Sequence, residues 1–167
     1  MAATAYYTDA YNKAIMPDQS APAGMLLAQA TTYTSATSSY AGDTIYMLRL
    51  PANAVLVDLL MSWTAGGGSG TLAVGTVTAS TGATVSATNI FGAFSSVGAG
   101  NRSLAGGTQG TTAIATAVGT VGVGTKFTVD TGLLVTNAAT AHPADDTISM
   151  AAVYYMDYGG DLAYDPG

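Results

Sequence analysis

Alternation of apolar and small polar residues with a period of two is the feature that most constrains how this chain can fold. Residues 55–63 carry it through a whole segment, and residues 147–158 carry it again near the C-terminus. Because successive side chains of a β-strand point to opposite faces, this period predicts half-buried strands. Threonine, alanine, glycine, serine and valine dominate these stretches, and such small side chains pack flat against another surface. The sequence therefore predicts an all-β protein.

Turn residues divide the chain into strand-sized segments. The predicted strands are residues 25–34, 44–50, 55–64, 71–78, 125–136 and 147–158. Pro51 ends the second of these, because proline has no N–H group for a ladder hydrogen bond. Residues 98–110 are expected to form an exposed loop. About seven or eight strands without a long helix predict an antiparallel β-sandwich or a jelly roll.

The alternation also predicts which side chains face the core. In residues 55–64 the predicted core face is Val55, Val57, Leu59, Met61 and Trp63. Later in the chain the predicted core faces are Leu72 and Val74, then Phe127, Val129, Leu133 and Val135, and finally Ile148, Met150, Ala152, Tyr154, Met156 and Tyr158. These residues give the sandwich one continuous core.

The 167 residues are expected to form one domain with an arm at each end. Residues 1–24 show no lasting period, so they are predicted to be an extended N-terminal arm with at most a short helical turn within residues 6–14. Residues 25–158 are the predicted β-sandwich domain, and residues 159–167 are a C-terminal tail. Termini of this kind are mobile unless something holds them. We expect that these arms are held, and that neighbouring subunits are the surfaces against which they lie.

Charge excludes several classes of partner. The chain has four basic and ten acidic side chains and a net charge of -6, whereas nucleic-acid binding requires clustered Lys and Arg. No apolar run reaches the ~20 residues of a membrane-spanning helix, and no signal peptide is visible. The expectation is a soluble product, made in a cytoplasm, that binds neither nucleic acid nor membrane. With 8% charged residues, much of its surface is expected to be covered by partner chains.

The sequence around Asp130 suggests an alternative to a structural protein, namely an aspartic protease. Val129-Asp130-Thr131-Gly132 has the hydrophobic-Asp-Thr-Gly pattern with which aspartic proteases present a catalytic carboxylate, and one copy per chain would require a homodimer. Too little chain follows the motif for the rest of such a fold. Asp with Gly two residues later is also ordinary turn chemistry. We therefore interpret Asp130 as a residue at a strand end.

Other ionisable residues are too few to build a catalytic or metal site. His142 has neither Cys nor Glu in the chain to complete a zinc site, and no Gly-x-Ser-x-Gly nucleophile motif occurs. Asp157, Asp161 and Asp165 could supply oxygen ligands to calcium, although an acidic, solvated tail explains them as well. The prediction is a protein with no catalytic residue, no cofactor and no metal ion.

Tyrosine is concentrated near both ends of the chain. Its ring buries a large area at low entropic cost while its hydroxyl stays polar, which suits protein interfaces. The predicted partner interface is Tyr6, Tyr7, Tyr11, Tyr155 and Tyr164. The alternative for the C-terminal group is that Tyr154 and Tyr158 belong to the core and the other tyrosines are exposed.

Three segments together resemble a known group of proteins. They are Gly-Asp-Thr-Ile-Tyr-Met-Leu-Arg-Leu-Pro-Ala-Asn-Ala-Val-Leu-Val-Asp-Leu at residues 42–59, Gly-Thr-Leu-Ala-Val-Gly at residues 70–75, and Asp-Thr-Ile-Ser-Met-Ala-Ala-Val-Tyr-Tyr at residues 146–155. This pattern resembles small capsid-associated proteins of tailed bacteriophages, including decoration (cement) proteins. The resemblance brings no catalytic residues with it.

The resemblance implies a non-enzymatic virion protein, made in the host cytoplasm, that lies on the capsid exterior and reinforces contacts between major capsid proteins. Its expected partners are the major capsid protein and other copies of itself, as a dimer or trimer. The alternative is a receptor- or glycan-binding fibre or tail module of a virion. Such a module is expected to show exposed aromatic residues on loops, whereas Trp63 lies within a strand pattern.

Overall fold

The computed structural model describes residues 4–12, 24–36, 42–64, 71–78, 93–95, 100–103, 124, 126–137 and 145–158. These residues form β1 (Ala5–Tyr7), α1 (Asp9–Asn12), β2 (Leu26–Thr34), β3 (Thr44–Leu50), β4 (Ala54–Trp63), β5 (Thr71–Thr78), β6 (Ala93–Ser95), β7 (Gly100–Ser103), β8 (Thr131–Asn137) and β9 (Thr147–Met156). No helix in the described part of the chain is long and apolar enough to cross a membrane.

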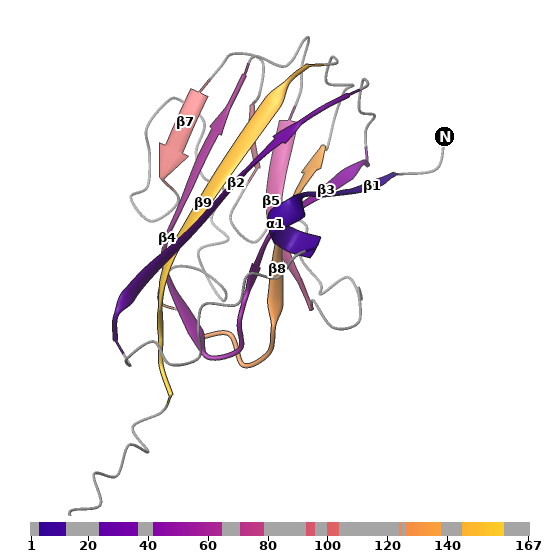
Figure 1. The fold of residues 1–167 in the computed structure, drawn as a ribbon. Helices are drawn as coiled ribbons and strands as arrows, with labels where there is room; N and C mark the ends of the chain where they lie inside the picture. The colour runs from indigo at the N-terminus through magenta and orange to yellow at the C-terminus, as the bar shows by residue number, and fades with distance from the viewer. Residues whose placement is uncertain are drawn as a thin grey trace, which may run out of the picture.

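The strands lie in two layers that face each other (Figure 1). Sheet A has the order β1-β3-β8-β5-β6, and sheet B has the order β2-β9-β4-β7. The β1–β3 pair is parallel, and the other neighbouring pairs are antiparallel. The predicted all-β sandwich is therefore confirmed, while the jelly-roll connectivity stays a prediction.

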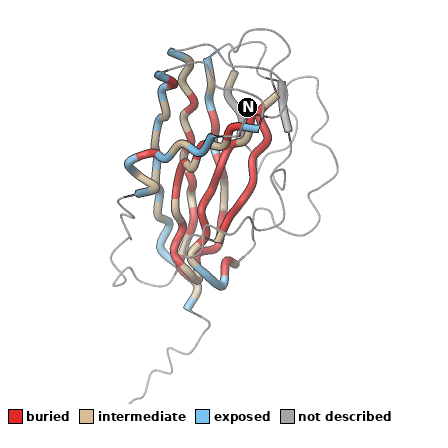
Figure 2. Tube along the Cα trace, turned by 90° about the vertical axis from the view of Figure 1, so that its right-hand side faces the viewer, coloured by how far each residue is buried: buried red, intermediate tan, exposed pale blue. Residues whose placement is uncertain are grey.

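The core fills the space between the two sheets, and its buried residues come from the central strands (Figure 2). β5 turns Leu72 and Val74 inward as predicted. β9 alternates without interruption, so that its predicted core face is buried from Ile148 to Met156. The largest fully buried side chains are Tyr154, Met47, Leu48, Leu50, Leu56, Leu59, Leu72, Leu133, Met150, Val74, Val77 and Val135.

A β-bulge corrects the predicted core face of β4. The register against β9 shifts between Leu56 and Asp58, which places two residues of β4 opposite one of β9 and reverses the alternation before that point. Leu56 is therefore completely buried although it was predicted to face outward, and Val57 is only partly buried. The prediction holds after the bulge, where Leu59 and Met61 face the core.

The segment before β8 is also different from the prediction. The strand begins at Thr131, and the preceding residues make only an isolated bridge between Lys126 and Val55. Phe127 is buried, but Val129 is 49% exposed, because the alternation expected through residues 125–136 does not exist before the strand starts. Thr131 Oγ1 donates a 2.9 Å hydrogen bond to the carbonyl oxygen of Val129 and holds this bend.

Residues 100–103 were expected in an exposed loop, and this expectation is wrong. They form β7, which pairs with the end of β4 so that Gly100 lies opposite Trp63. A Cβ atom on Gly100 would lie 2.7 Å from Cζ2 of Trp63. Glycine at this position therefore allows the indole ring, which packs against the core, to lie close against the backbone of β7.

The described part of the predicted N-terminal arm belongs to the sandwich. β1 pairs with β3, and Thr8 caps the helical turn α1, since its Oγ1 accepts a 3.2 Å hydrogen bond from the backbone N–H of Tyr11. Thr8 Oγ1 also donates to the carbonyl oxygen of Met47. The helical turn lies within residues 6–14 as predicted, and β1 is extended and pairs with the chain's own β3. Residues 1–3, 13–23 and 159–167, the rest of the predicted arms, lie outside the described residues.

Candidate interaction surface

Three tyrosine rings gather on the outer face of sheet A, and we call them the tyrosine cluster: Tyr7, Tyr11 and Tyr46. The β1–β3 register places Tyr7 beside Tyr46, and their rings stack with centroids 4.6 Å apart and planes 12° apart. Tyr11 reaches back from α1, so its ring lies 5.1 Å from that of Tyr46 and 5.7 Å from that of Tyr7. Such offset and tilted pairs stabilise beyond their buried area.

The cluster is half inside the protein and half outside. Burial raises the pKa of Tyr11 and of Tyr46, with a further rise from the neighbouring phenol in each case, and Arg49 partly opposes the rise at Tyr11. Tyr7 is 51% exposed. The cluster therefore holds the Tyr7 ring at the surface, as a contact that combines an apolar face with a hydroxyl group.

Gly132 in β8 provides the space that Tyr11 occupies. A Cβ atom at this position would lie 2.6 Å from Cε2 of Tyr11 and 2.7 Å from Cγ1 of Val77. Since non-bonded carbon atoms prefer about 3.5–4.0 Å, only glycine allows this close approach. Gly132 was singled out in the sequence only as part of the Asp-Thr-Gly motif, and its contact with the distant Tyr11 could not be seen there.

The other predicted interface tyrosines do not join this cluster. Tyr6 points to the opposite side of β1, where its ring lies 5.7 Å from that of Tyr33 on β2. Tyr155 is partly buried in β9 of sheet B, and Tyr164 lies outside the described residues. The core alternative is confirmed for Tyr154, which is fully buried, and not for Tyr158, which is 37% exposed.

The outer face of sheet B is a second broad surface, which the sequence analysis did not single out. Cross-strand registers divide it into two parts. One part, which we call the apolar half, consists of Leu26, Ala28, Ala30, Leu60, Ala151, Val153 and Tyr155. The other part, the hydroxyl half, consists of Thr32, Thr34, Ser62, Thr64, Thr147 and Ser149.

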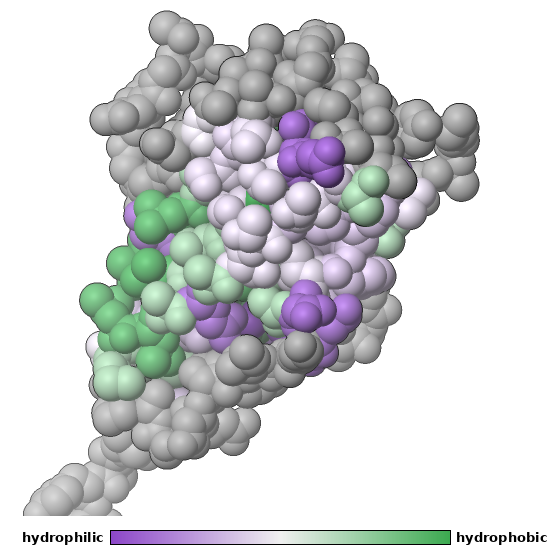
Figure 3. Space-filling model, turned by 45° about the horizontal axis from the view of Figure 1, so that its top comes forward, coloured by the Kyte–Doolittle hydropathy of each residue, from purple (hydrophilic) through white to green (hydrophobic). Residues whose placement is uncertain are grey.

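This face exposes apolar side chains directly to solvent. Leu26 is 62% exposed and Leu60 is 43% exposed. In Figure 3 hydrophobic side chains gather at the lower left of the view, where β2 starts and β9 ends in Figure 1. On β4 the face carries the carboxylate of Asp58, which accepts a 2.7 Å hydrogen bond from the backbone N–H of Leu59. The signal for this surface was present in the sequence as the Ala, Thr and Ser that alternate with core residues.

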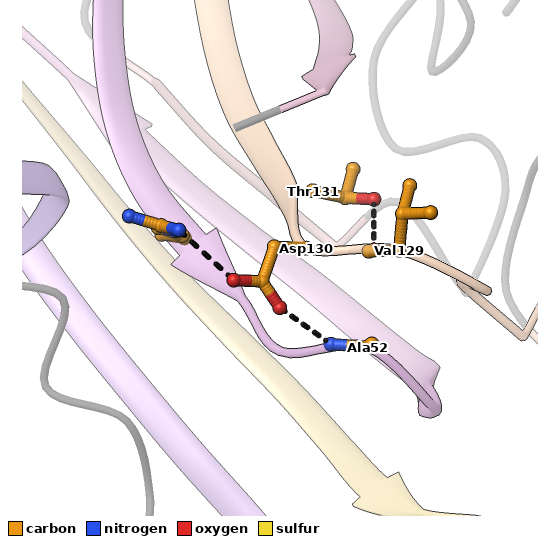
Figure 4. Close-up of polar contacts among 5 residues, drawn as sticks. Ala52, Val129, Asp130 and Thr131 are labelled. Carbon is orange, nitrogen blue, oxygen red and sulfur yellow. Dashed lines mark hydrogen bonds and ion pairs between the residues drawn. The ribbon is translucent and has the colours of Figure 1, made fainter. Parts of the chain in front are cut away.

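Asp130 is a structural residue at a strand end. It accepts a 3.0 Å hydrogen bond from the backbone N–H of Ala52 and forms a 2.9 Å ion pair with Arg49 (Figure 4). The two side chains are 25% and 24% exposed. The carboxylate thus ties the β3–β4 turn to the start of β8, and both of its oxygens are engaged by its own chain.

The described residues contain no group of three or more His, Cys, Asp or Glu side chains that could hold a metal ion. Asp157, one of the three possible calcium ligands, forms a 3.3 Å ion pair with Lys126. Asp161, Asp165 and His142 lie outside the described residues.

Comparison with known structures relates the fold to phage capsids. A chain of the capsid of Ralstonia phage GP4 matches with a TM-score of 0.69 and 22% sequence identity, over 92% of this chain and 99% of that chain. A chain of the capsid asymmetric unit of cyanophage Pam1 matches with a TM-score of 0.49 and 14% identity, over 85% of this chain and 95% of that chain. No protein-family model and no curated protein matches the sequence. The first likeness shows a shared fold over nearly the full length of both chains.

Proposed function

We propose that this chain is a non-enzymatic virion structural protein that binds the outer surface of a phage capsid and reinforces contacts between major capsid proteins. The observation that carries the proposal is the fold shared with a chain of the capsid of Ralstonia phage GP4, which covers 99% of that chain. The resemblance of residues 42–59, 70–75 and 146–155 to capsid-associated proteins supports it independently of the fold.

The arrangement of surfaces suits a protein that joins neighbours. A reinforcing protein must touch at least two subunits, and it therefore needs two contact surfaces that point in different directions. The tyrosine cluster lies on the outer face of sheet A, and the apolar half lies on the outer face of sheet B. Because these are the opposite outer faces of one sandwich, two capsid subunits can be engaged at once.

The chemistry of these surfaces favours protein over other partners. Interface cores are depleted of charge and enriched in aromatic residues, and the two surfaces combine exposed Tyr7 and Leu26 with small uncharged side chains. Asp58 adds a carboxylate to the sheet B face, and it already accepts a hydrogen bond from the backbone N–H of Leu59. Apart from Asp58, burying these side chains removes little charge from water, so the desolvation penalty is small. We propose Tyr7 and Tyr155 as contacts of the two surfaces, with Tyr6 and Tyr11 positioning the N-terminal segment. Tyr164 is proposed as a further contact.

The proposal is tested by where the protein is found in purified particles. We expect the chain to co-purify with intact, tail-free heads in a fixed ratio to the major capsid protein, and to be accessible to antibody on those heads. Recovery only with tails would contradict the proposal and favour the receptor- or glycan-binding module. Recovery with heads but without antibody access would contradict the exterior location.

A pair of variants tests the contact surface. Tyr7→Ser is expected to weaken binding to heads that lack the protein by roughly tenfold, as for loss of a moderate interface hot spot. Val129→Ser is the matched control, because Val129 is 49% exposed and Tyr7 is 51% exposed. The control should bind like the parent. Equal binding of both variants would show that the tyrosine cluster is not part of the interface.

A further inference from the structure

β2 is an edge strand among the described strands, and its own sequence lacks the usual protective residues. It lies at the end of sheet B, and among the described strands it pairs with β9 alone. Natural edge strands are blunted by Lys, Pro, bulges or short length, because a row of free N–H and C=O groups pairs readily with another strand. β2 has nine residues, Leu-Leu-Ala-Gln-Ala-Thr-Thr-Tyr-Thr, with no charge and no proline, and its register with β9 shows no bulge.

The backbone geometry identifies the groups on this free edge. Ser35, directly after β2, donates its N–H to Asp146 and accepts from Asp145 through its C=O, so both of its groups point toward the β9 side. The backbone N–H and C=O of Thr147 bond to Thr64, on the β4 side of β9. The N–H and C=O of the next residue, Ile148, therefore point to the β2 side, where Tyr33 is its register partner. Successive residues of a strand point to opposite edges. The free edge therefore carries the N–H and C=O groups of Leu26, Ala28, Ala30, Thr32 and Thr34.

We infer that this edge pairs with β2 of a second copy of the chain, antiparallel across a two-fold axis at Ala30. In this register Ala30 lies opposite its own copy, Ala28 lies opposite Thr32, and Leu26 lies opposite Thr34. Every free-edge group of the five residues then has a partner. The two copies of sheet B become one continuous sheet, and their outer faces form one extended surface.

The absence of charge favours a second copy over an unrelated chain. A two-fold contact brings each residue against its own copy or against a neighbour from the same strand, so a charged residue near the axis would face a like charge. The protein has a net charge of -6, yet β2 contains no Asp, Lys or Arg. The side chains nearest the axis on the outer face, Ala28, Ala30 and Thr32, are small and exposed, and they leave room for a close approach.

Charge variants at the axis provide the sharpest experiment. The parent is expected to dimerise in sedimentation equilibrium between low micromolar and millimolar concentration. Ala30→Lys and Ala30→Asp should each weaken the dimer, because the introduced charge meets its own copy, and added salt should partly restore it. Mixing the two variants should produce a heterodimer tighter than either homodimer. A parent that stays monomeric throughout, or a mixture that does not associate, would overturn the inference.

Backbone variants test the pairing itself. Ala30→Pro removes the free-edge N–H without removing a bond to β9, and the two symmetric hydrogen bonds lost should weaken the dimer about thirtyfold. Ala30→Thr, which keeps the N–H and favours strands, is the matched control and should dimerise like the parent. If Ala30→Pro fails to fold, the charge mixture decides the question alone. Because dimerisation is measured without capsids, its failure is distinct from failure of capsid binding.

Discussion

Replacing Gly132 with alanine tests whether the N-terminal segment packs on sheet A. The new Cβ atom would lie 2.6 Å from Cε2 of Tyr11 and 2.7 Å from Cγ1 of Val77. Tyr11 stands on a four-residue helical turn and can move, whereas Val77 is 1% exposed within β5 and cannot move without disturbing its neighbours. Alanine at position 132 is therefore expected to displace Tyr11 and to strain the β5–β8 pair.

The expected magnitude follows from two opposing terms. Overpacking a well-packed site costs about 1–3 kcal/mol, and alanine returns about 0.4–1 kcal/mol by restricting the unfolded chain. The net loss of unfolding free energy is then about 1–2 kcal/mol. For a chain of this size that corresponds to a fall in Tm of roughly 2–8 °C, which thermal unfolding followed by circular dichroism measures directly.

A double-mutant cycle separates the two contacts. In a Tyr11→Ala background the clash with the ring is gone, so Gly132→Ala should cost less there by about 0.5–1 kcal/mol, and the contact with Val77 should account for the remainder. A Tm for Gly132→Ala equal to or above that of the parent would refute the close packing. A cost unchanged by Tyr11→Ala would show that Tyr11 does not lie against β8.

Three further predictions concern single side chains. Burial raises the pKa of Tyr154 from 10.0 to about 12. Its contribution to stability is therefore intact below pH 10 and is lost as the pH rises from 10 to 12, where the unfolded chain releases a proton that the folded chain keeps. In denaturant titrations, Tyr154→Phe should make the fall of unfolding free energy over this range less steep by about 1.4 kcal/mol per pH unit. Asp130→Asn keeps an acceptor for the N–H of Ala52 but loses the ion pair with Arg49. Urea unfolding should therefore show a free energy of unfolding lower by up to about 1 kcal/mol. An acid peptidase activity that vanishes in this variant would contradict the structural role. Trp63→Ala removes a partly exposed ring packed against the core, and a loss of about 2–4 kcal/mol is expected, somewhat below that for a fully buried aromatic; an unchanged Tm would show that the ring contributes nothing to the core.

The predictions for residues 71–78 and 147–156 were confirmed because the strand signal they used is a property of one segment alone. Residues 71–78 and 147–156 form β5 and β9 and bury their predicted core residues. The same reasoning was wrong at Val57 and Val129, where a bulge and a late strand start interrupt the period. A bulge depends on the partner strand, so the spacing of apolar residues cannot reveal it.

Contacts between distant segments could not be predicted in the same way. The tyrosine-rich N-terminus was predicted to serve an interface, but its pairing with β3 and the stacking of Tyr7 on Tyr46 depend on which edge of sheet A was free. β7 shows the same limit, because residues 100–103 read as a loop until the end of β4 offers them a partner. Short strands have too few residues to show an alternating pattern, and they become strands because they pair with the edge of an existing sheet.

The sequence by itself determined the fold class, most of the core and the scarcity of ionisable groups. These depend on local alternation and composition, which no neighbour alters. Only the tertiary structure decided that Asp130 would hold Arg49, 81 residues away, that Gly132 would make room for Tyr11, and that β2 would be the end strand of sheet B among the described strands. The physical reason is that sheet order and register are chosen by all the strands together, through the burial of a shared core and the pairing of every backbone group.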